Sequence, residues 1–247
     1  MISEKLDWYG KALSNLGAAA LARRQISSKF LRAKPYRLTS KYAAHDLWCR
    51  PGTSDLAVFD QIFTHREYRC LDGLDLSGLI LDCGANVGYS SAYLLTAFPN
   101  CRVIAVEPHP DNFSVLCENL MPFAGRHECI NAAVWSHPTR LALDLTSSGG
   151  GLEWGREYFQ SDGDTVATDI PSLMKSSHAN RIALLKMDIE GAEEQVFGAK
   201  DISWLSATDN IVIELHGEKR REIFMNAIEG HGFSVSKCDE LTVCCRK

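Results

Sequence analysis

Four side chains near the ends of two apolar runs have the chemistry for proton transfer or metal binding. One run is followed by Asp188 and Glu190, and a later run ends with Glu214 and His216. Residues two apart in a strand point to the same side, so Glu214 and His216 share a face. Asp188, Glu190 and His216 are candidate bases for a hydroxyl proton. Asp188, Glu214 and His216 are alternatively candidate ligands for Mg²⁺ or Mn²⁺.

Two charged neighbours have structural interpretations that compete with these roles. Glu193 falls in the first turn of the following helical pattern, where the helix dipole stabilises a carboxylate. Lys186 precedes the acidic pair by two residues and can form an ion pair with Glu214. Both the catalytic and the structural interpretations stay open from these residues alone.

A glycine-containing turn predicts a ligand site upstream. Residues 82–88 (DCGANVG) connect an apolar run to a helical pattern. Gly84 permits a tight turn that a ligand can approach closely, and Gly88 permits close packing where the helix begins. Asn86 replaces the middle Gly of the related D-x-G-x-G-x-G pattern, and Asn tolerates left-handed backbone. The turn lacks the Lys that follows the glycines in a phosphate-binding G-x-x-x-x-G-K-[ST] loop. It also does not match the G-x-G-x-x-G motif of dinucleotide-binding proteins.

An acidic residue lies at the spacing expected for ribose binding. Glu107 ends the second apolar run, 19 residues after Gly88. A carboxylate about 20 residues beyond such a turn can accept hydrogen bonds from both ribose hydroxyls. The alternative is that Glu107 caps the helix that begins near Pro110. The joint spacing favours a nucleoside ligand.

Several segments in order resemble the FkbM family of S-adenosylmethionine-dependent methyltransferases. They are LDCGANVGYSSAYL, VIAVEPHPDNF, INAAVW, LLKMDIEGAEEQVF and IVIELHG, preceded by RPGTSDLAVFDQIF. The resemblance covers residues 50–233, and LLKMDIEGAE is its most specific segment. It implies the α/β class I methyltransferase (Rossmann-like) fold, a doubly wound, seven-stranded and mostly parallel sheet with an antiparallel edge strand.

The resemblance also implies S-adenosylmethionine as cofactor and assigns residues to its parts. The ribose would lie at Glu107, and Asn131 and Ala133 would lie near the adenine. The methionine part would be surrounded by Asp82, Gly84, Asn86 and Gly88.

The elements that position these residues follow from hydrophobic patterns. Short, almost wholly apolar runs predict buried parallel strands at residues 79–84, 102–108, 128–135, 182–188 and 210–216. Helical patterns lie between most of them, at residues 90–98, 111–120, 192–205 and 219–229. Residues 233–236 and 241–246 predict a hairpin at one edge of the sheet. Residues 147–164 interrupt the alternation and predict either a lid or a mobile surface loop.

Charge divides the chain at about residue 50. The net charge is −5, but residues 1–50 contain 10 Lys+Arg against 3 Asp+Glu, a net of +7, and the remainder is −12. Apolar spacing predicts a helix over residues 1–34 and a second helix around residues 56–63. We therefore expect a basic helical extension at residues 1–49 and a methyltransferase domain at residues 50–247. The extension can pack on its own acidic domain, cover the acceptor cleft, recruit an anionic substrate, contact a membrane surface peripherally or contribute to a homodimer.

Composition excludes several classes of protein. An acidic chain argues against a nucleic-acid partner, and no apolar segment has the roughly 20 residues of a transmembrane helix. Nine cysteines, an odd number without a C-x-x-C pair, favour a reducing cytoplasm over a disulfide framework.

The predicted reaction is methyl transfer to a hydroxyl oxygen of a sugar, glycan or other small secondary metabolite. The first alternative is a nicotinamide-dependent oxidoreductase on a similar sheet. The second is a non-catalytic interaction module that is derived from a methyltransferase.

Overall fold

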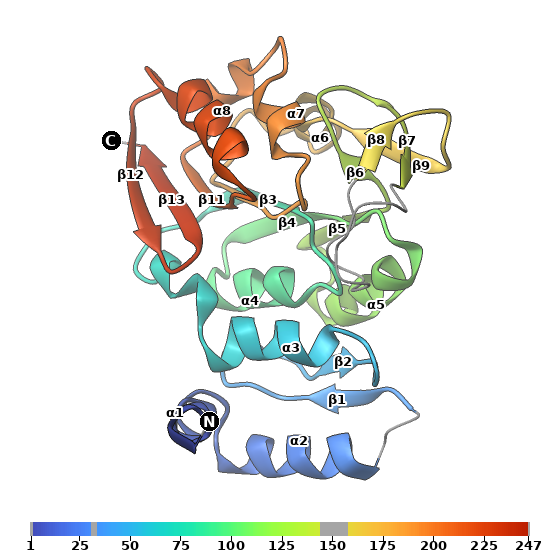
Figure 1. Cartoon of the computed structure of the whole chain (residues 1–247), viewed down its shortest axis with the longest axis vertical. Coiled ribbons are helices and arrows are strands. Elements are labelled where there is room, and N and C mark those ends of the chain that lie inside the picture. The colour runs from blue at the N-terminus through green and yellow to red at the C-terminus, as the bar shows by residue number, and fades with distance from the viewer. Residues whose placement is uncertain (1, 31–33, 144–157, 247) are drawn as a thin grey trace.

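The computed structural model describes residues 2–30, 34–143 and 158–246, and a seven-stranded sheet forms its centre (Figure 1). Its strands are, in spatial order, β12 (Phe233–Cys238), β13 (Leu241–Arg246), β11 (Asn210–Glu214), β10 (Leu184–Met187), β3 (Gly78–Cys83), β4 (Cys101–Val106) and β5 (His127–Ile130). The five strands from β11 to β5 run parallel, and β13 runs antiparallel to both of its neighbours. The predicted seven-stranded, mostly parallel α/β sheet is confirmed.

The antiparallel strand does not itself form the edge. β12 is the edge strand, because the tight turn at Asp239, with φ of +53°, folds β13 back between β12 and β11. Strand order reverses at β3, with β4 and β5 on one side and β10 and β11 on the other. Ligands of such sheets bind beyond the carboxyl ends of the strands at this reversal. Gly84, Asp188 and His216 follow β3, β10 and β11, which are neighbours there; β11 ends at Glu214, so His216 lies beyond the strand in which it was predicted.

Helices cover both faces of the sheet, as the apolar strand sequences require (Figure 1). The elements on one face are α4 (Tyr89–Ala97) and α5 (Pro110–Leu120), and those on the other are α6 (Ile170–Ser176), α7 (Glu193–Phe197) and α8 (Glu218–Ile228). Alternate residues of each strand enter different core clusters. Ile80 and Leu184 pack on the side of α4, whereas Leu81 and Leu185 pack on the side of α8.

Two predicted elements are shorter than expected. Residues 128–135 are not one strand, because a turn after Ile130 sends the chain into a second, four-stranded sheet. Its order is β6 (Ala133–Val134), β9 (Thr165–Thr168), β7 (Thr139–Leu143) and β8 (Tyr158–Gln160). The helix expected at 192–205 ends at Gly198, which is the C-cap of α7, and a 3₁₀ turn (η4, Ser203–Ala207) follows. Of the predicted lid, residues 147–157 lie outside the described residues, and the rest contributes β8.

The predicted N-terminal helix is two helices, α1 (Ile2–Leu16) and α2 (Ala18–Phe30), because Gly17 adopts a φ of +90° between them. The elements that follow are β1 (Tyr36–Leu38), β2 (Leu47–Cys49), α3 (Asp55–Phe59), the π-helical turn η1 (Asp60–Thr64) and the 3₁₀ turn η2 (Glu67–Leu71). Leu16 and Leu47 belong to the same core cluster as Tyr89 of α4, so this part packs on the sheet domain. Among the described helices, none is both long and apolar enough to cross a bilayer.

Candidate functional site

The turn after β3 has the backbone that its sequence predicts. Gly84, Asn86 and Gly88 adopt positive φ angles of +77°, +50° and +84°. A Cβ atom on Gly84 would overlap the backbone oxygen of Asp188, so glycine lets the ends of β3 and β10 meet. A Cβ atom on Gly88 would lie 2.7 Å from Cδ1 of Leu116, which confirms close helix packing there.

A cavity of about 730 Å³, here called cavity 1, opens beside this turn. Its walls come from the turn itself, residues 106–109 after β4, residues 132–135 and the turn after β10. Within the described part of the chain, Oδ1 of Asn86 is buried without a hydrogen-bond partner at this wall, so the cavity offers an acceptor to a polar ligand.

Glu107 is held rigidly in the wall of cavity 1. Its side chain is 6% exposed, its Oε2 accepts a hydrogen bond of 2.9 Å from the Asn86 backbone N–H, and its Oε1 accepts one of 2.9 Å from the His109 N–H. Burial raises the pKa of Glu107 to about 7, against the opposing effect of these hydrogen bonds. Each carboxylate oxygen keeps a lone pair for a further donor. The geometry fits the predicted ribose contact.

The other residues predicted to bind the cofactor divide into two groups. Gly84, Asn86 and Ala133 line cavity 1, whereas Asp82, Gly88 and Asn131 do not. Asp82 is fully buried, accepts hydrogen bonds of 2.6 Å from Ser90 and Ser91, and forms an ion pair of 3.2 Å with Lys186. The Nδ2 group of Asn131 donates to the backbone oxygens of Glu107 and Pro108. Asp82 and Asn131 therefore support the loops that form the wall.

Cavity 2, of about 700 Å³, adjoins cavity 1 on the side of η1 and η2. Both cavities are lined by Gly84, Asn86, Asp188 and Glu190. Cavity 2 adds Glu214 of β11 and several residues for which the sequence predicted no role, among them Gln61, Ile62, Glu67 and Tyr68. The available signal was the segment RPGTSDLAVFDQIF, residues 50–63, which contains Gln61 and Ile62 and ends shortly before Glu67 and Tyr68. His109 and Trp135, which the sequence did not assign to the site, also line cavity 1.

Asp188, Glu190, Glu214 and His216 come together as predicted, with an additional partner. Nε2 of His216 lies 3.4 Å from Oε2 of Glu190 and 3.7 Å from Oε1 of Glu214. Nδ1 of His216 lies 3.0 Å from Oε1 of Glu193, which is fully buried. Glu193 does begin α7, but it also fixes the imidazole. His216 lines neither cavity and lies behind the carboxylates.

The surroundings shift the protonation of this cluster. Burial, followed by repulsion from Asp188, raises the pKa values of Glu190 and Glu214 to about 7. The hydrogen bond with Glu193 raises the pKa of His216 to about 9, against the opposing effect of burial. His216 is therefore protonated at neutral pH and stabilises the neighbouring carboxylates, while Glu190 and Glu214 can exchange protons near neutrality.

The three predicted metal ligands lie close enough together to bind one metal ion. One ligand atom each of Asp188, Glu214 and His216 can be chosen such that all lie within 4.8 Å of one another. Oδ1 of Asp188 is buried without a hydrogen-bond partner among the described residues. Lys186 pairs with Asp82 and donates to the Gly84 oxygen, so the proposed Lys186–Glu214 ion pair is wrong. The donors fit a divalent cation, although Nε2 of His216 must lose its proton to bind it.

Comparison with known proteins identifies the matching family. Residues 82–235 match the sequence profile of the methyltransferase FkbM domain. The chain is similar to "Methyltransferase 1" of Beauveria bassiana (26% identity, covering 70% of this chain and 81% of the relative). It is also similar to "Methyltransferase sdnD" of Sordaria araneosa (26% identity, 64% and 73%).

A solved structure matches the fold. The crystal structure of methyltransferase FkbM from Methylobacillus flagellatus aligns with a TM-score of 0.51 at 16% identity. The alignment covers 90% of this chain and 59% of that chain, so this chain spans less than two thirds of the length of that protein. The likeness confirms the class I methyltransferase fold that the sequence predicted.

Proposed function

Because the chain belongs to the FkbM family of methyltransferases, which use S-adenosylmethionine, we propose that it methylates a hydroxyl oxygen of a sugar, glycan or other small secondary metabolite. When bound, S-adenosylmethionine supplies an electrophilic methyl group on a sulfonium sulfur. Family membership decides against the nicotinamide-dependent alternative. The choice of an oxygen acceptor is supported by the side chains where the two cavities meet.

The observation that carries this proposal is the set of residues common to cavities 1 and 2. Gly84, Asn86, Asp188 and Glu190 line both. We place the cofactor in cavity 1, beside Glu107, and the acceptor in cavity 2. A methyl group at the junction would then face the acceptor directly beside two carboxylates. Methyl transfer is an in-line displacement, so holding both reactants at such a junction supplies much of the rate acceleration.

The carboxylates at the junction can act as the base that an oxygen acceptor requires. A hydroxyl group must lose its proton as its oxygen gains the methyl group. Glu190, with a pKa raised to about 7, is matched to that task at neutral pH, and Asp188 is its neighbour on the same turn. In the proposed step the new carbon–oxygen bond forms, the carbon–sulfur bond breaks and the hydroxyl proton passes to Glu190. His216, protonated and held by Glu193, keeps the carboxylate in place.

The lining of cavity 2 supports a polyhydroxylated acceptor. Glu67, Glu214 and the Gln61 side chain offer hydrogen-bond acceptors to several hydroxyl groups. Burial raises the pKa of Glu67, and it raises the pKa of Glu214 to about 7, so the Glu214 carboxyl group can also be neutral and donate near neutral pH. A cavity with many acceptors and a few apolar side chains is suited to a sugar. The divalent cation at Asp188, Glu214 and His216 is the alternative means of lowering the hydroxyl pKa.

Two variants test the proposed base. Asp188→Asn and Glu190→Gln remove negative charge without changing side-chain size, and Glu128→Gln on the outer strand β5 is the matched control. We expect kcat to fall by about 10²- to 10⁴-fold in one or both site variants, with affinity for S-adenosylhomocysteine within about threefold of the wild type. Turnover within about threefold of wild type in the double variant would contradict base catalysis. Unchanged biological activity in that variant would favour the non-catalytic module.

We further propose a reducing cytoplasm as the site of action. The support is the set of nine cysteines, all of them free thiols, of which Cys49, Cys83, Cys101 and Cys244 are buried. Buried thiols of this kind act as small apolar core residues. Cysteines remain thiols in a reducing compartment, whereas an oxidising compartment favours disulfides.

A further inference from the structure

Helix α1 exposes a stripe of large apolar side chains. Leu6, Tyr9 and Leu13 are 68%, 48% and 54% exposed. Their spacing of three and four residues places them on one face of the helix. Large apolar side chains in a contiguous exposed set mark an interaction surface more often than scattered ones do.

This stripe is additional to the face with which α1 packs on the protein. Ala12 and Leu16 are buried in the core, Trp8 packs against it, and the Asn15 side chain donates a hydrogen bond of 2.9 Å to the Thr64 oxygen of η1. α1 is therefore apolar on an inner and an outer side. The inner side accounts for its attachment to the fold, and the outer side needs another explanation.

Helix α2 continues the exposed apolar surface. Ile26 is 59% exposed, and Ala18, Ala19 and Ala22 are exposed on the same helix. The hydroxyl of Tyr9 accepts a hydrogen bond of 3.5 Å from Gln25, which places the stripe of α1 beside the end of α2 that carries Ile26. We call Leu6, Tyr9, Leu13 and Ile26 the apolar stripe.

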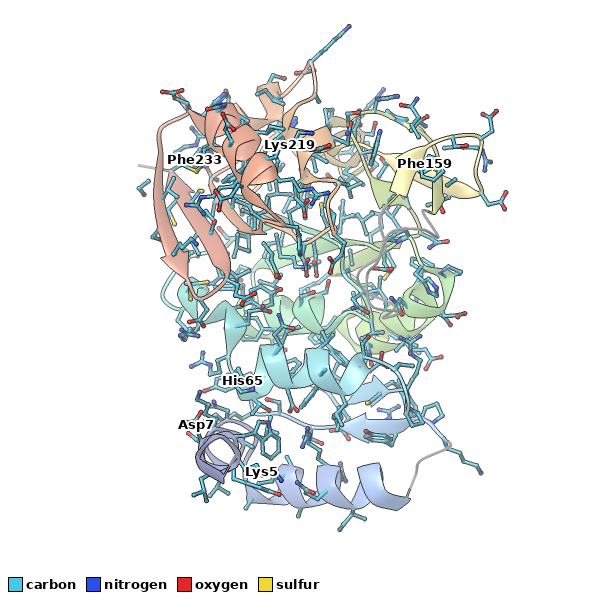
Figure 2. All side chains as sticks on the ribbon, in the orientation of Figure 1. Lys5, Asp7, His65, Phe159, Lys219 and Phe233 are labelled. Atoms are coloured by element: carbon cyan, nitrogen blue, oxygen red, sulfur yellow. The ribbon has the colours of Figure 1, made fainter. Side chains whose placement is uncertain are left out.

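Positive charge surrounds the apolar stripe. Lys5 and Lys11 are exposed on α1 and Arg23 is exposed on α2; Lys11 forms an ion pair of 2.8 Å with Asp7, and Arg23 forms one of 3.3 Å with Asp46. Lys5 and Asp7 project from α1 at the end of the molecule opposite α8 (Figure 2). The first 50 residues carry a net charge of +7, in a chain whose remainder is −12. A surface with this combination matches an interfacial amphipathic helix more closely than an ordinary solvated face.

We propose that the apolar stripe docks α1 and α2 on the surface of an anionic phospholipid bilayer. Leu6, Tyr9, Leu13 and Ile26 would enter the boundary between headgroups and acyl chains, and the surrounding Lys and Arg side chains would pair with lipid phosphates. The competing occupant is a second copy of the chain. A two-fold contact through the same stripe would bring two copies of α1 and α2 against each other, each with five Lys+Arg against two Asp+Glu in residues 2–30, a net charge of +3, whereas an anionic bilayer complements that charge.

The test is flotation of the full chain with vesicles. We expect binding to vesicles of phosphatidylcholine mixed with phosphatidylglycerol, weakened by salt at about 1 M, where the Debye length is about 3 Å. The double variant Leu6→Gln/Leu13→Gln should bind at least ~10-fold more weakly, because both side chains leave the lipid in a polar form. The control Met121→Gln replaces another apolar side chain, 66% exposed and distant from the stripe, and should bind as the wild type does.

Three results would overturn the proposal. They are no flotation of the wild type, equal flotation with pure phosphatidylcholine, and wild-type flotation by the double variant. A dimer that the double variant converts to a monomer, without vesicle binding, would assign the stripe to a second copy instead. Unchanged circular dichroism and unchanged binding of S-adenosylhomocysteine show that the variant is folded, and they keep this test separate from that of the methyltransferase activity.

Discussion

Replacing Glu107 by Gln removes the charge from a carboxylate that two backbone N–H groups hold in the wall of cavity 1. The amide retains one oxygen and gains an NH₂ group. Since both oxygens of Glu107 accept hydrogen bonds, from Asn86 and from His109, the NH₂ group must face one of these donors. The variant therefore loses one fixed acceptor whichever way the amide turns, and the wall is disturbed on that side.

The expected loss of affinity follows from the hydrogen bonds to ribose. A hydrogen bond to a charged group contributes about 1.5–3 kcal/mol. The variant loses one ribose contact and weakens the other from charged to neutral, so we expect about 2–4 kcal/mol. This corresponds to a Kd for S-adenosylhomocysteine roughly 30- to 700-fold above that of the wild type.

Isothermal titration calorimetry with S-adenosylhomocysteine measures this change without turnover. Glu128→Gln, at an ion pair with Arg102 on the outer strand, is the control. Because the pKa of Glu107 is raised to about 7, wild-type affinity should rise with pH as Glu107 ionises, and Glu107→Gln should lose this dependence. A Kd within about threefold of wild type, with the pH dependence retained, would refute the ribose contact.

Other expected outcomes follow from the same structure. Gly84→Ala should destabilise the fold by more than about 3 kcal/mol in urea unfolding, because a Cβ atom there meets backbone at positive φ; a smaller loss than for Gly88→Ala would contradict this. Glu193→Gln should lower the pKa of His216 from about 9 in an NMR titration, whereas Glu194→Gln next to it should not. The Tm of the ligand-free protein should fall as pH rises from about 5 to about 9. Between pH 4.5 and about 7, the carboxyl groups of Glu107, Glu190 and Glu214 bind more protons in the folded than in the unfolded state, so stability falls as pH rises. Between pH 6.5 and about 9, the same holds for the His216 imidazole, whose proton stabilises the fold. A Tm that rises from pH 5 to pH 9 would contradict these pKa shifts. If a divalent cation activates the acceptor, exhaustive chelation should abolish turnover and Mg²⁺ or Mn²⁺ should restore it, whereas full activity after chelation leaves carboxylate catalysis.

The sheet and the turn after β3 could be predicted because their signals are local. Buried parallel strands are apolar along their whole length, so each run identifies one strand without knowledge of its partners. Asn86 is the clearest case, because its residue type alone predicts tolerance of left-handed backbone, and its φ is +50°. The spacing from Gly88 to Glu107 likewise reflects the fixed length of a helix that connects two adjacent parallel strands.

The parts that the sequence did not reveal depend on packing between distant segments. Glu193 satisfies the pattern of a helix first turn equally well whether or not it contacts His216, which lies 23 residues away. Lys186 has acidic candidates on both neighbouring strands, and the register of β10 with β3 places it opposite Asp82. Glu67 and Tyr68 line cavity 2 only because η1 and η2 fold over the carboxyl ends of the strands.

We propose that the protein transfers a methyl group to a hydroxyl oxygen at the junction of the two cavities. The most direct measurement incubates the protein and host extract with S-adenosylmethionine that carries a ¹³C-labelled methyl group, then locates the label by mass spectrometry and NMR. We expect a labelled methyl ether on a sugar, glycan or small metabolite, formed by the wild type and lost with Asp188→Asn/Glu190→Gln. A label on nitrogen, carbon or sulfur, or equal labelling by that double variant, would contradict it.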